Sequence, residues 1–520
     1  MASRVRSMPP IKVDEYRWRS SPKDAALRVR RACAAEAMFG IEASNRRGEN
    51  DLFIAATVRL HTLPASPKTL TLGDLEHMTQ SSLVQLRASQ PQVAVSLSWD
   101  KQGKCMLQYR APADMDEARR WAAGVVSAEA SSRTLMDMRD RVEDEKKQFS
   151  GAKPKSHAVM VYISASVSGL DAALGDSEVH YLFRFNHCLF DGIASRQIVA
   201  MLFQNLASQI CSVPTDTNED IDWKQSISNL PPAFVALMDS EQDLSGSTFD
   251  RTVHDHMALM KKKSNIGLKP RQSKLGTPQT DFHTFTKDES QSILSGIATR
   301  LQPGHTITHL AMAAVLLALM KADGTPNGAI VSTISVINGR RYLKEYKKGE
   351  KLYIASCQAP AILLFENIDQ LAISDTSSKS EIYEKLEKAT QLARDSFTSN
   401  LATPCKLSMS VPVMEFGAVL AAMNTKPTPV PQVESPVFTS DGINERWVPR
   451  ELLSESNEKA IDVDDIYFFS NQSSSTVSVR LSSWRDCIRL SIDYNGGYYE
   501  KQDMVTYLNE IAQIMSTFAN

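Results

Sequence analysis

One stretch of the chain, VHYLFRFNHCLFDGIASRQIVAMLF from Val179 onward, combines residue types that suit acid–base chemistry. Within it, His187, Asp191 and Gly192 stand in the spacing H-x3-D-G. Free histidine titrates at about 6.5, close to neutrality, so His187 suits the role of a general base. Asp191 can serve as a second catalytic carboxylate that orients the imidazole, as in a triad. These residues are the first candidates for a catalytic site.

Local patterns predict how the fold positions His187. The residues before it alternate as in a strand with one buried face, and the positions in step with His187 are Tyr181, Phe183 and Phe185. The residues after Gly192 follow helical spacing, with an apolar stripe at Ile198, Met201, Leu202 and Leu206. We therefore expect His187 at the end of a buried strand, where Gly192 supplies a permissive backbone for a tight turn into a helix. Alternation places Cys188 on the opposite side, which favours packing over a reactive thiol.

The motif in this setting resembles that of CoA-dependent acyltransferases built like chloramphenicol acetyltransferase. This superfamily includes plant BAHD acyltransferases, alcohol acetyltransferases and peptide-synthetase condensation domains. The likeness extends to GHTITHLAMAAVLLALMKA from Gly304, SVINGRRYL from Ser335 and VFTSDGINERWVP from Val437. Asn186 replaces the first His of the condensation-domain pattern, and no DFGWG string is present, so the resemblance is to fungal acetyltransferases.

The resemblance implies direct acetyl transfer from acetyl-CoA to an alcohol of secondary metabolism. The acceptor it implies is a sesquiterpenoid, specifically a trichothecene at its C-15 hydroxyl. His187 would take the proton of that hydroxyl, and no acyl-enzyme would form; accordingly, the sequence has no G-x-S-x-G elbow. The tetrahedral oxyanion needs a donor about 3 Å away. Candidate donors lie in the run Ser470–Ser475, which precedes a predicted strand in the half opposite the motif.

The resemblance also implies a structural role for Asp191, as the partner of an arginine that braces the turn. Arg340 is the favoured partner, and its neighbour Arg341 is the alternative.

A basic segment is the candidate site for coenzyme A. Its positive residues are Arg251, Lys261, Lys262, Lys263, Lys269, Arg271 and Lys274, against the single acidic residue Asp255. The 3′-phosphate and diphosphate of coenzyme A favour such a cluster, although a solvated basic loop is an equal alternative. The assigned candidates are Lys261, Lys262, Lys263, Lys269, Arg271 and Ser473.

No metal or tightly bound cofactor is expected. His305 and His309 have the spacing of a zinc pair, but a third ligand is missing nearby, so packing at a helix start is favoured. The string His254-Asp255-His256 is better interpreted as part of a surface helix.

Composition excludes several other classes of protein. The 520 residues carry 58 Lys+Arg and 60 Asp+Glu, a net charge of -2, which argues against nucleic acid as the main partner. The longest apolar run, Leu310 to Met320, is too short to cross a bilayer. The N-terminus lacks the apolar core of a signal peptide, and seven cysteines without a CxxC pair indicate reduced thiols. We therefore expect a cytoplasmic monomer without a membrane partner.

Interleaved strand and helix patterns predict an α+β fold of two similar lobes, each a mixed β-sheet flanked by helices, with the active site in a channel between them. The expected divisions are an N-terminal lobe at 1–225, a crossover segment at 226–280 and a C-terminal lobe at 281–520. Within the first lobe a helical pattern is expected from Pro22 to Phe39.

Two alternatives to this function stay open. The chain can be an acyltransferase of the same fold that uses another alcohol or a carrier-protein acyl donor. It can also be a non-catalytic binding or scaffold protein, although such a protein would have no need of His187.

Overall fold

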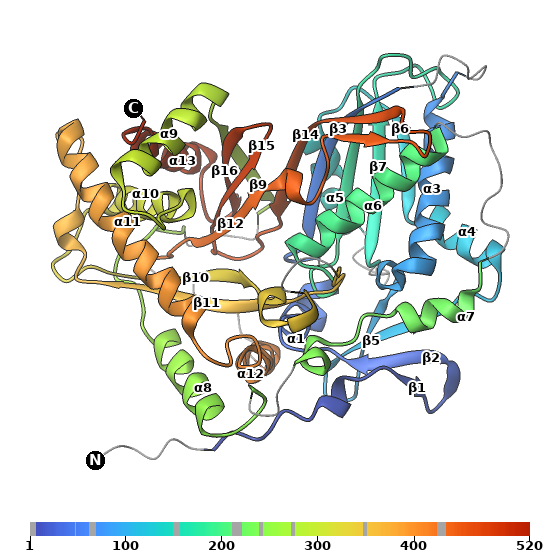
Figure 1. The fold of residues 1–520 in the computed structure, drawn as a ribbon, viewed down its shortest axis with the longest axis horizontal. Helices are drawn as coiled ribbons and strands as arrows, with labels where there is room; N and C mark the ends of the chain where they lie inside the picture. Colours follow the sequence, from blue (N-terminus) through green and yellow to red (C-terminus); the bar gives the residue numbers. More distant parts are fainter. Residues whose placement is uncertain are drawn as a thin grey trace.

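The computed structural model describes residues 7–46, 48–61, 69–148, 157–210, 221–238, 243–271, 276–346, 351–423 and 433–519. The described chain forms two lobes, and each is built on a six-stranded mixed sheet (Figure 1). This arrangement confirms the predicted architecture of two sheet-and-helix lobes.

The first sheet carries the His187 motif at the end of its fourth strand. Its strands, in spatial order, are β13 (Glu451–Leu453), β14 (Lys459–Ser470), β3 (Leu52–Leu60), β8 (Val179–Phe185), β7 (Val159–Ala165) and β6 (Val126–Ala130). Only the β6–β7 pair among these is parallel. Alternation separates its two faces: α3 (Leu72–Ser89) and α6 (Gly192–Ile210) pack on one, and α5 (Leu135–Gln148) packs on the other.

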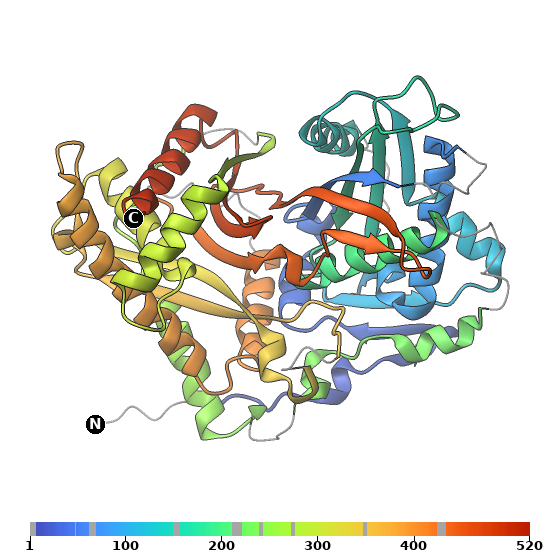
Figure 2. The ribbon, with the colours of Figure 1, turned by 45° about the horizontal axis from the view of Figure 1, so that its top comes forward.

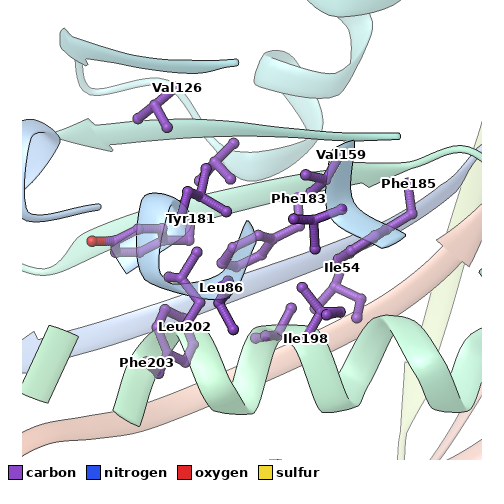
Figure 3. Close-up of a cluster of buried hydrophobic side chains, with 14 of the residues drawn as sticks. Ile54, Leu86, Val126, Val159, Tyr181, Phe183, Phe185, Ile198, Leu202 and Phe203 are labelled. Carbon is purple, nitrogen blue, oxygen red and sulfur yellow. The ribbon is translucent and has the colours of Figure 1, made fainter. Parts of the chain in front are cut away.

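The strand–turn–helix unit around the motif forms as the sequence predicts. Side chains of β8 and α6 interdigitate in one buried cluster (Figure 3), which includes Tyr181, Phe183, Phe185, Ile198, Leu202 and Phe203. Aromatic rings meet edge to face there, with 5.2 Å between the centroids of Tyr181 and Phe203. Burying this apolar surface fixes both elements, and therefore fixes the turn that joins them.

The second sheet forms the other lobe. Its strands, in spatial order, are β11 (Gln358–Glu366), β10 (Ile330–Asn338), β12 (Val437–Ile443), β15 (Ser478–Trp484), β16 (Cys487–Asn495) and β9 (Pro278–Thr284). It is covered by α10 (Ile307–Asp323), α11 (Lys379–Ala402), α9 (Lys287–Arg300) and α13 (Lys501–Ser516). The apolar run Leu310 to Met320 lies inside α10 and is buried on all sides.

The strand β14 crosses from the second half of the chain into the first sheet (Figure 2). It pairs along its length with β3, from Ile461 opposite Leu60 to Ser470 opposite Leu52. The chain reaches the hairpin of β13 and β14 from β12 and leaves it for β15, and both β12 and β15 belong to the second sheet. The sheets therefore do not follow the expected division at residue 281, because 451–470 completes the first sheet. Strand β9 (Pro278–Thr284) spans that same division, so the second sheet begins before residue 281.

A third, smaller sheet replaces the helix expected between Pro22 and Phe39. Its strands are β1 (Arg19–Ser21), β2 (Asp24–Arg31), β5 (Cys105–Arg110) and β4 (Ser96–Trp99). Only α1 (Ala35–Phe39) is helical in that segment. The prediction is wrong because helix propensity is a weak preference here: β2 pairs with β5, and the buried ion pair between Arg30 and Glu36 (2.6 Å) folds α1 back on the strand.

The remaining helices lie around the two lobes. They are α2 (Glu42–Arg46), α4 (Met115–Ala123), α7 (Trp223–Ser226), α8 (Ser247–Met260) and α12 (Ser410–Met423). Two of them, α8 and α12, pack against each other through Phe249, Val253, Met409 and Val413. None of the helices in the described ranges has the length and apolar character that a bilayer crossing demands.

Candidate active site

His187 lies in the turn directly after β8 and lines a cavity between the lobes. Its Nδ1 is 2.9 Å from the carbonyl oxygen of Phe190. A carbonyl only accepts hydrogen bonds, so Nδ1 carries the proton and Nε2 is the basic nitrogen of the neutral ring. The imidazole stacks on the ring of Phe39 from α1, with 3.8 Å between centroids and 14° between planes. One hydrogen bond and one stacked ring therefore fix the orientation of the base.

Asn186 holds the turn that presents His187. Its side-chain oxygen accepts hydrogen bonds from the backbone N–H of Cys188 and from the amide of Asn45, both at 3.0 Å. Cys188 is fully buried, and its thiol donates to the carbonyl of Glu36 at 3.1 Å. Burial raises the pKa of this thiol well above its ordinary value, so Cys188 stays protonated.

The environment of His187 favours its neutral form. Burial is the largest influence and lowers the pKa of the imidazole below its ordinary value of 6.5. The Phe190 carbonyl and the Asp191 carboxylate oppose this effect, and the positive charge of Arg480 adds to it. A histidine held neutral at physiological pH is ready to accept a proton.

Asp191 is buried and accepts five hydrogen bonds from three segments of the chain. Two come from the backbone N–H groups of Ile193 and Ala194, at 3.1 and 2.9 Å, which makes Asp191 the N-terminal cap of α6. A third comes from the backbone of Cys357 at 2.8 Å, just before β11. The last two come from the guanidinium of Arg340, at 2.8 and 3.1 Å. None of these bonds goes to His187, so the carboxylate joins the two lobes rather than forming a triad.

Arg340 is itself held by the second lobe. Its guanidinium donates to the carbonyls of Tyr353 and Ala355, with distances of 2.8 to 3.0 Å. Burial is the largest influence and lowers its pKa, but Asp191, with smaller contributions from Cys357 and Tyr353, offsets this, and the pKa is raised above the ordinary value. Arg341, the alternative partner, is exposed. The pair Asp191–Arg340 is therefore buried, bidentate and fully hydrogen-bonded on both sides.

Gly192 serves a purpose other than the expected one. It is the first residue of α6 and does not adopt a positive φ, so the turn does not require its backbone freedom. A Cβ at this position would lie 3.0 Å from Nη1 of Arg196 and 3.3 Å from Cζ of Phe468. Glycine is therefore required for close packing between α6 and β14.

The cavity has a volume of about 490 Å³ and is lined by both lobes. The floor is one face of the second sheet, where the register places Ile334 opposite Ile362 and Val336 opposite Pro360. We call this part, together with Met38, Met260, Val413 and Met414, the apolar end. The rest of the lining includes polar residues from β12, from β15 and from neighbouring loops, which we call the polar end: Asn50, Thr439, Ser440, Gln472, Thr476 and Ser478. His187 is accessible from this space.

Comparisons with known proteins agree with this geometry. The family model described as 15-O-acetyltransferase Tri3 matches residues 8–418. The chain is 32% identical to trichothecene 15-O-acetyltransferase TRI3 of Fusarium sporotrichioides, over 99% of both chains. The chain belongs to the Tri3 family. It is also 31% identical to trichothecene O-acetyltransferase TRI3 of Trichoderma arundinaceum, over the full length of both. The solved structure of the Fusarium TRI3 protein superimposes with a TM-score of 0.92, at 30% identity and 99% coverage of each chain.

As a member of the Tri3 family, the chain is an acetyltransferase that uses acetyl-CoA as its co-substrate. Two arginines of this acetyltransferase line the cavity, although sequence analysis did not single them out. Arg196 and Arg480 both contact the Phe468 ring, with guanidinium carbons 4.2 and 4.4 Å from its centroid. Both also bind the carboxylate of Asp441, at 2.7 and 3.1 Å. One available signal was Arg196, the single charged residue of the α6 sequence, four positions after Gly192.

The predicted oxyanion donors lie where the chain crosses between the lobes. Ser470 ends β14, in the same sheet as the motif rather than in the opposite half, and its hydroxyl donates to Asp493 at 3.1 Å. Ser470 lines the cavity, and so does Gln472 in the crossover that follows. Ser473 belongs to the same crossover but is outside the cavity lining.

The predicted CoA residues do not form one patch. Lys261, Lys262 and Lys263 are exposed directly after Met260, which lines the apolar end, and Lys262 pairs with Glu366 at 3.1 Å. Lys269 and Arg271 are exposed farther along, beyond the bridge between Leu268 and Glu434. The Glu434 carboxylate accepts a hydrogen bond from Ser475, which lies between Gln472 and Thr476 of the polar end. Lys269 and Arg271 therefore lie near that end. The seventh basic residue of the segment, Lys274, lies outside the described residues.

The histidine pairs weighed as metal ligands have local roles. His309 accepts a hydrogen bond from the backbone N–H of Thr306 at 3.2 Å, at the start of α10, and His305 contacts the carbonyl of Gln302. Within the described ranges, no three His, Cys, Asp or Glu side chains are arranged to hold a metal ion.

Proposed function

We propose that this acetyltransferase transfers the acetyl group of acetyl-CoA to the C-15 hydroxyl of a trichothecene, with His187 as the general base. The observation that carries the proposal is the neutral imidazole at the cavity, whose protonated Nδ1 is bound to Phe190 and whose Nε2 is basic. The names of the relatives support the acceptor and its C-15 position.

In the proposed step, Nε2 of His187 takes the proton of the acceptor hydroxyl as the oxygen attacks the acetyl carbonyl. The tetrahedral intermediate collapses by breaking the carbon–sulfur bond. The CoA thiolate leaves and takes up the proton from the imidazolium, which restores the base. The donor supplies the acetyl group directly, so no nucleophilic side chain is needed.

The oxyanion of the intermediate needs positive charge close to His187. We assign this role to Arg480, because its side chain lines the same cavity as His187 and carries a permanent positive charge. Ser470 is a weaker candidate because its hydroxyl already donates to Asp493. Asp191 and Arg340 are positioning residues in this scheme, since they hold the turn and the start of α6.

We place the pantetheine arm of acetyl-CoA at the polar end, because its amides can bond there to Asn50, Gln472 and Thr476. Lys269 and Arg271, beyond that end, are then the predicted residues best placed for the CoA phosphates. Their replacement by glutamine should raise the KM for acetyl-CoA, whereas replacing Lys261 should not.

We further propose that the enzyme acts as a cytoplasmic monomer. The six cysteines within the described ranges are free thiols, which is typical of the reducing cytoplasm. Light scattering of the purified protein tests the oligomeric state.

The deciding experiment incubates the purified enzyme with acetyl-CoA and a trichothecene that has a free C-15 hydroxyl. We expect thiol release from CoA and an ester at C-15. The same trichothecene blocked by a C-15 acetate is the matched control and should release no thiol. Turnover with other alcohols alone, or only with an acyl carrier protein as donor, would overturn the assigned substrates. Absence of any transfer would favour a non-catalytic protein of this fold.

A further inference from the structure

His256 is a buried side chain that the proposed mechanism does not use. It lies on α8, is 5% exposed and lines the cavity. Within the part of the chain that the structure describes, its ring has no hydrogen-bond partner, unlike those of His187 and His309. Its neighbours His254 and Asp255 do not line the cavity, so the three residues do not act together as a chelate.

The surroundings place His256 at the apolar end. The helix α8 lies against β11 and α12, and the cavity walls there are Met260, Ile362 and Val413. Burial, aided by the nearby charge of Lys406, lowers the pKa of His256 to about 4. The ring is therefore neutral at physiological pH, and can donate a hydrogen bond from one nitrogen and accept one at the other. No ring nitrogen of His256 belongs to the fully buried atoms that lack a partner, so the nitrogens face the cavity, where a bound molecule can hydrogen-bond to them.

The chemistry of the two substrates decides which one reaches this ring. The pantetheine arm carries amides along its length, which suits the polar end around Asn50 and Gln472. A sesquiterpenoid presents a hydrocarbon skeleton with few oxygens, which suits walls of Ile, Met, Val and Pro with few polar groups. We propose that His256 is a specificity residue, which hydrogen-bonds an oxygen of the acceptor other than the reacting hydroxyl. This inference rests on the proposed function and adds the residue that recognises the acceptor.

The test compares two acceptors in the His256→Phe variant, which keeps a planar ring but removes both nitrogens. One acceptor is the trichothecene with a free C-15 hydroxyl, and the other is cyclohexylmethanol, which has no second oxygen. We expect the ratio of kcat/KM values, trichothecene over cyclohexylmethanol, to fall about three- to tenfold, the effect of one lost hydrogen bond. The KM for acetyl-CoA should stay unchanged. His256→Gln, which retains an amide donor and acceptor, should restore part of the ratio.

The controls separate this proposal from the proposed function and from simple damage. His254→Phe, on the same helix but outside the cavity lining, should leave the ratio and both KM values unchanged. The proposal would be overturned if His256→Phe left the ratio of the two kcat/KM values unchanged. That is also the pattern of a general loss of folding, which lowers both values together. A raised KM for acetyl-CoA would instead place the donor at His256, and would also overturn it. Failure of the wild-type enzyme to acetylate the trichothecene would count against the proposed function itself.

Discussion

His187 and Asp191 are four residues apart in one turn, yet the protein holds their side chains in opposite ways. The imidazole makes a hydrogen bond to Phe190, stacks on Phe39 and reaches the cavity. The carboxylate accepts five hydrogen bonds, two of them from an arginine of the other lobe. A group that must gain and lose a proton is thus oriented with few bonds. A group that must stay charged is surrounded by donors. The motif therefore separates chemistry from positioning, and each prediction below tests that separation.

The largest expected effect is on the rate in the His187→Ala variant. Loss of a general base should lower kcat by about two to four orders of magnitude, while the melting temperature and the binding of CoA stay close to those of the wild type. Thiol release measures kcat, and calorimetry measures the melting temperature and the binding of CoA. His180→Gln is the matched control, since His180 lies on β8, the strand that precedes His187, and contacts Thr57. Turnover within about tenfold of the wild type would remove His187 from the chemistry.

The Asp191→Asn variant should lose both stability and activity. The NH2 group of asparagine would replace one of the two carboxylate oxygens and would face the N–H donors of Arg340 or Cys357. The buried guanidinium would also lose its counter-charge. Breaking such a buried pair costs about 3–5 kcal/mol of unfolding free energy, which urea denaturation measures. A variant with full stability but a slow rate would make Asp191 an orienting member of a triad instead.

Arg340→Gln should reproduce the stability defect from the other side of the pair. Combined with Asp191→Asn, the two losses should be far from additive, because both variants break one interaction. Arg59→Gln offers a matched control: Arg59 pairs with Asp464 at 2.6 Å but is half exposed, so its loss should cost far less stability than the loss of Arg340. Additive losses would show that Asp191 and Arg340 act independently.

Gly192→Ala should have a smaller effect, on stability first. The added methyl would press on Arg196, which cannot withdraw easily because Asp441 and Asn444 hold it at 2.7 and 2.8 Å. Overpacking of this kind costs about 1–3 kcal/mol. Ala194→Gly, two residues later in the same helix, separates helix propensity from packing. A Gly192→Ala variant as stable as the wild type would show that α6 and β14 can move apart freely.

The smallest expected effect is on the pH dependence of the rate, which reports the pKa of His187. Burial lowers the pKa of His187 below 6.5, and the base must be neutral to act, so kcat/KM should rise with pH through a midpoint below 6.5. Arg480→Gln removes a charge that also lowers this pKa, so its midpoint should move upward. Rate profiles between about pH 4.5 and 8 test both. A midpoint above 7 in the wild type would contradict the environment described for the imidazole.

Local sequence patterns predicted the strand and the helix next to the site, because the spacing of apolar residues within each element determines which face is buried. The alternation before His187 and the apolar stripe after Gly192 correspond to β8 and α6. The two-lobed plan was also predictable, through the resemblance to a known superfamily. In contrast, the helix expected from Pro22 to Phe39 depended on propensity, and long-range pairing with β5 overrides it.

Other features had no local signal. The positions of β13 and β14 in the first sheet depend on pairing with β3, hundreds of residues earlier. Arg196 and Arg480 meet at Phe468 only after the lobes come together. For Gly192, sequence alone suggested a flexible backbone, whereas the reason lies in the side chains that approach it. Such features arise from tertiary contacts, so a single sequence does not reveal them.

The strand β14 also has a consequence for the order in which the protein can fold during its synthesis. Arg59 and Asp464, which join β3 to β14, are 405 residues apart. At about 5 to 20 residues per second, a ribosome needs about 20 to 80 s to make the residues between them. During that time one edge of β3 has no partner, and an open strand edge invites pairing with other chains. The nascent chain therefore carries an open strand edge until β14 emerges and completes the first sheet.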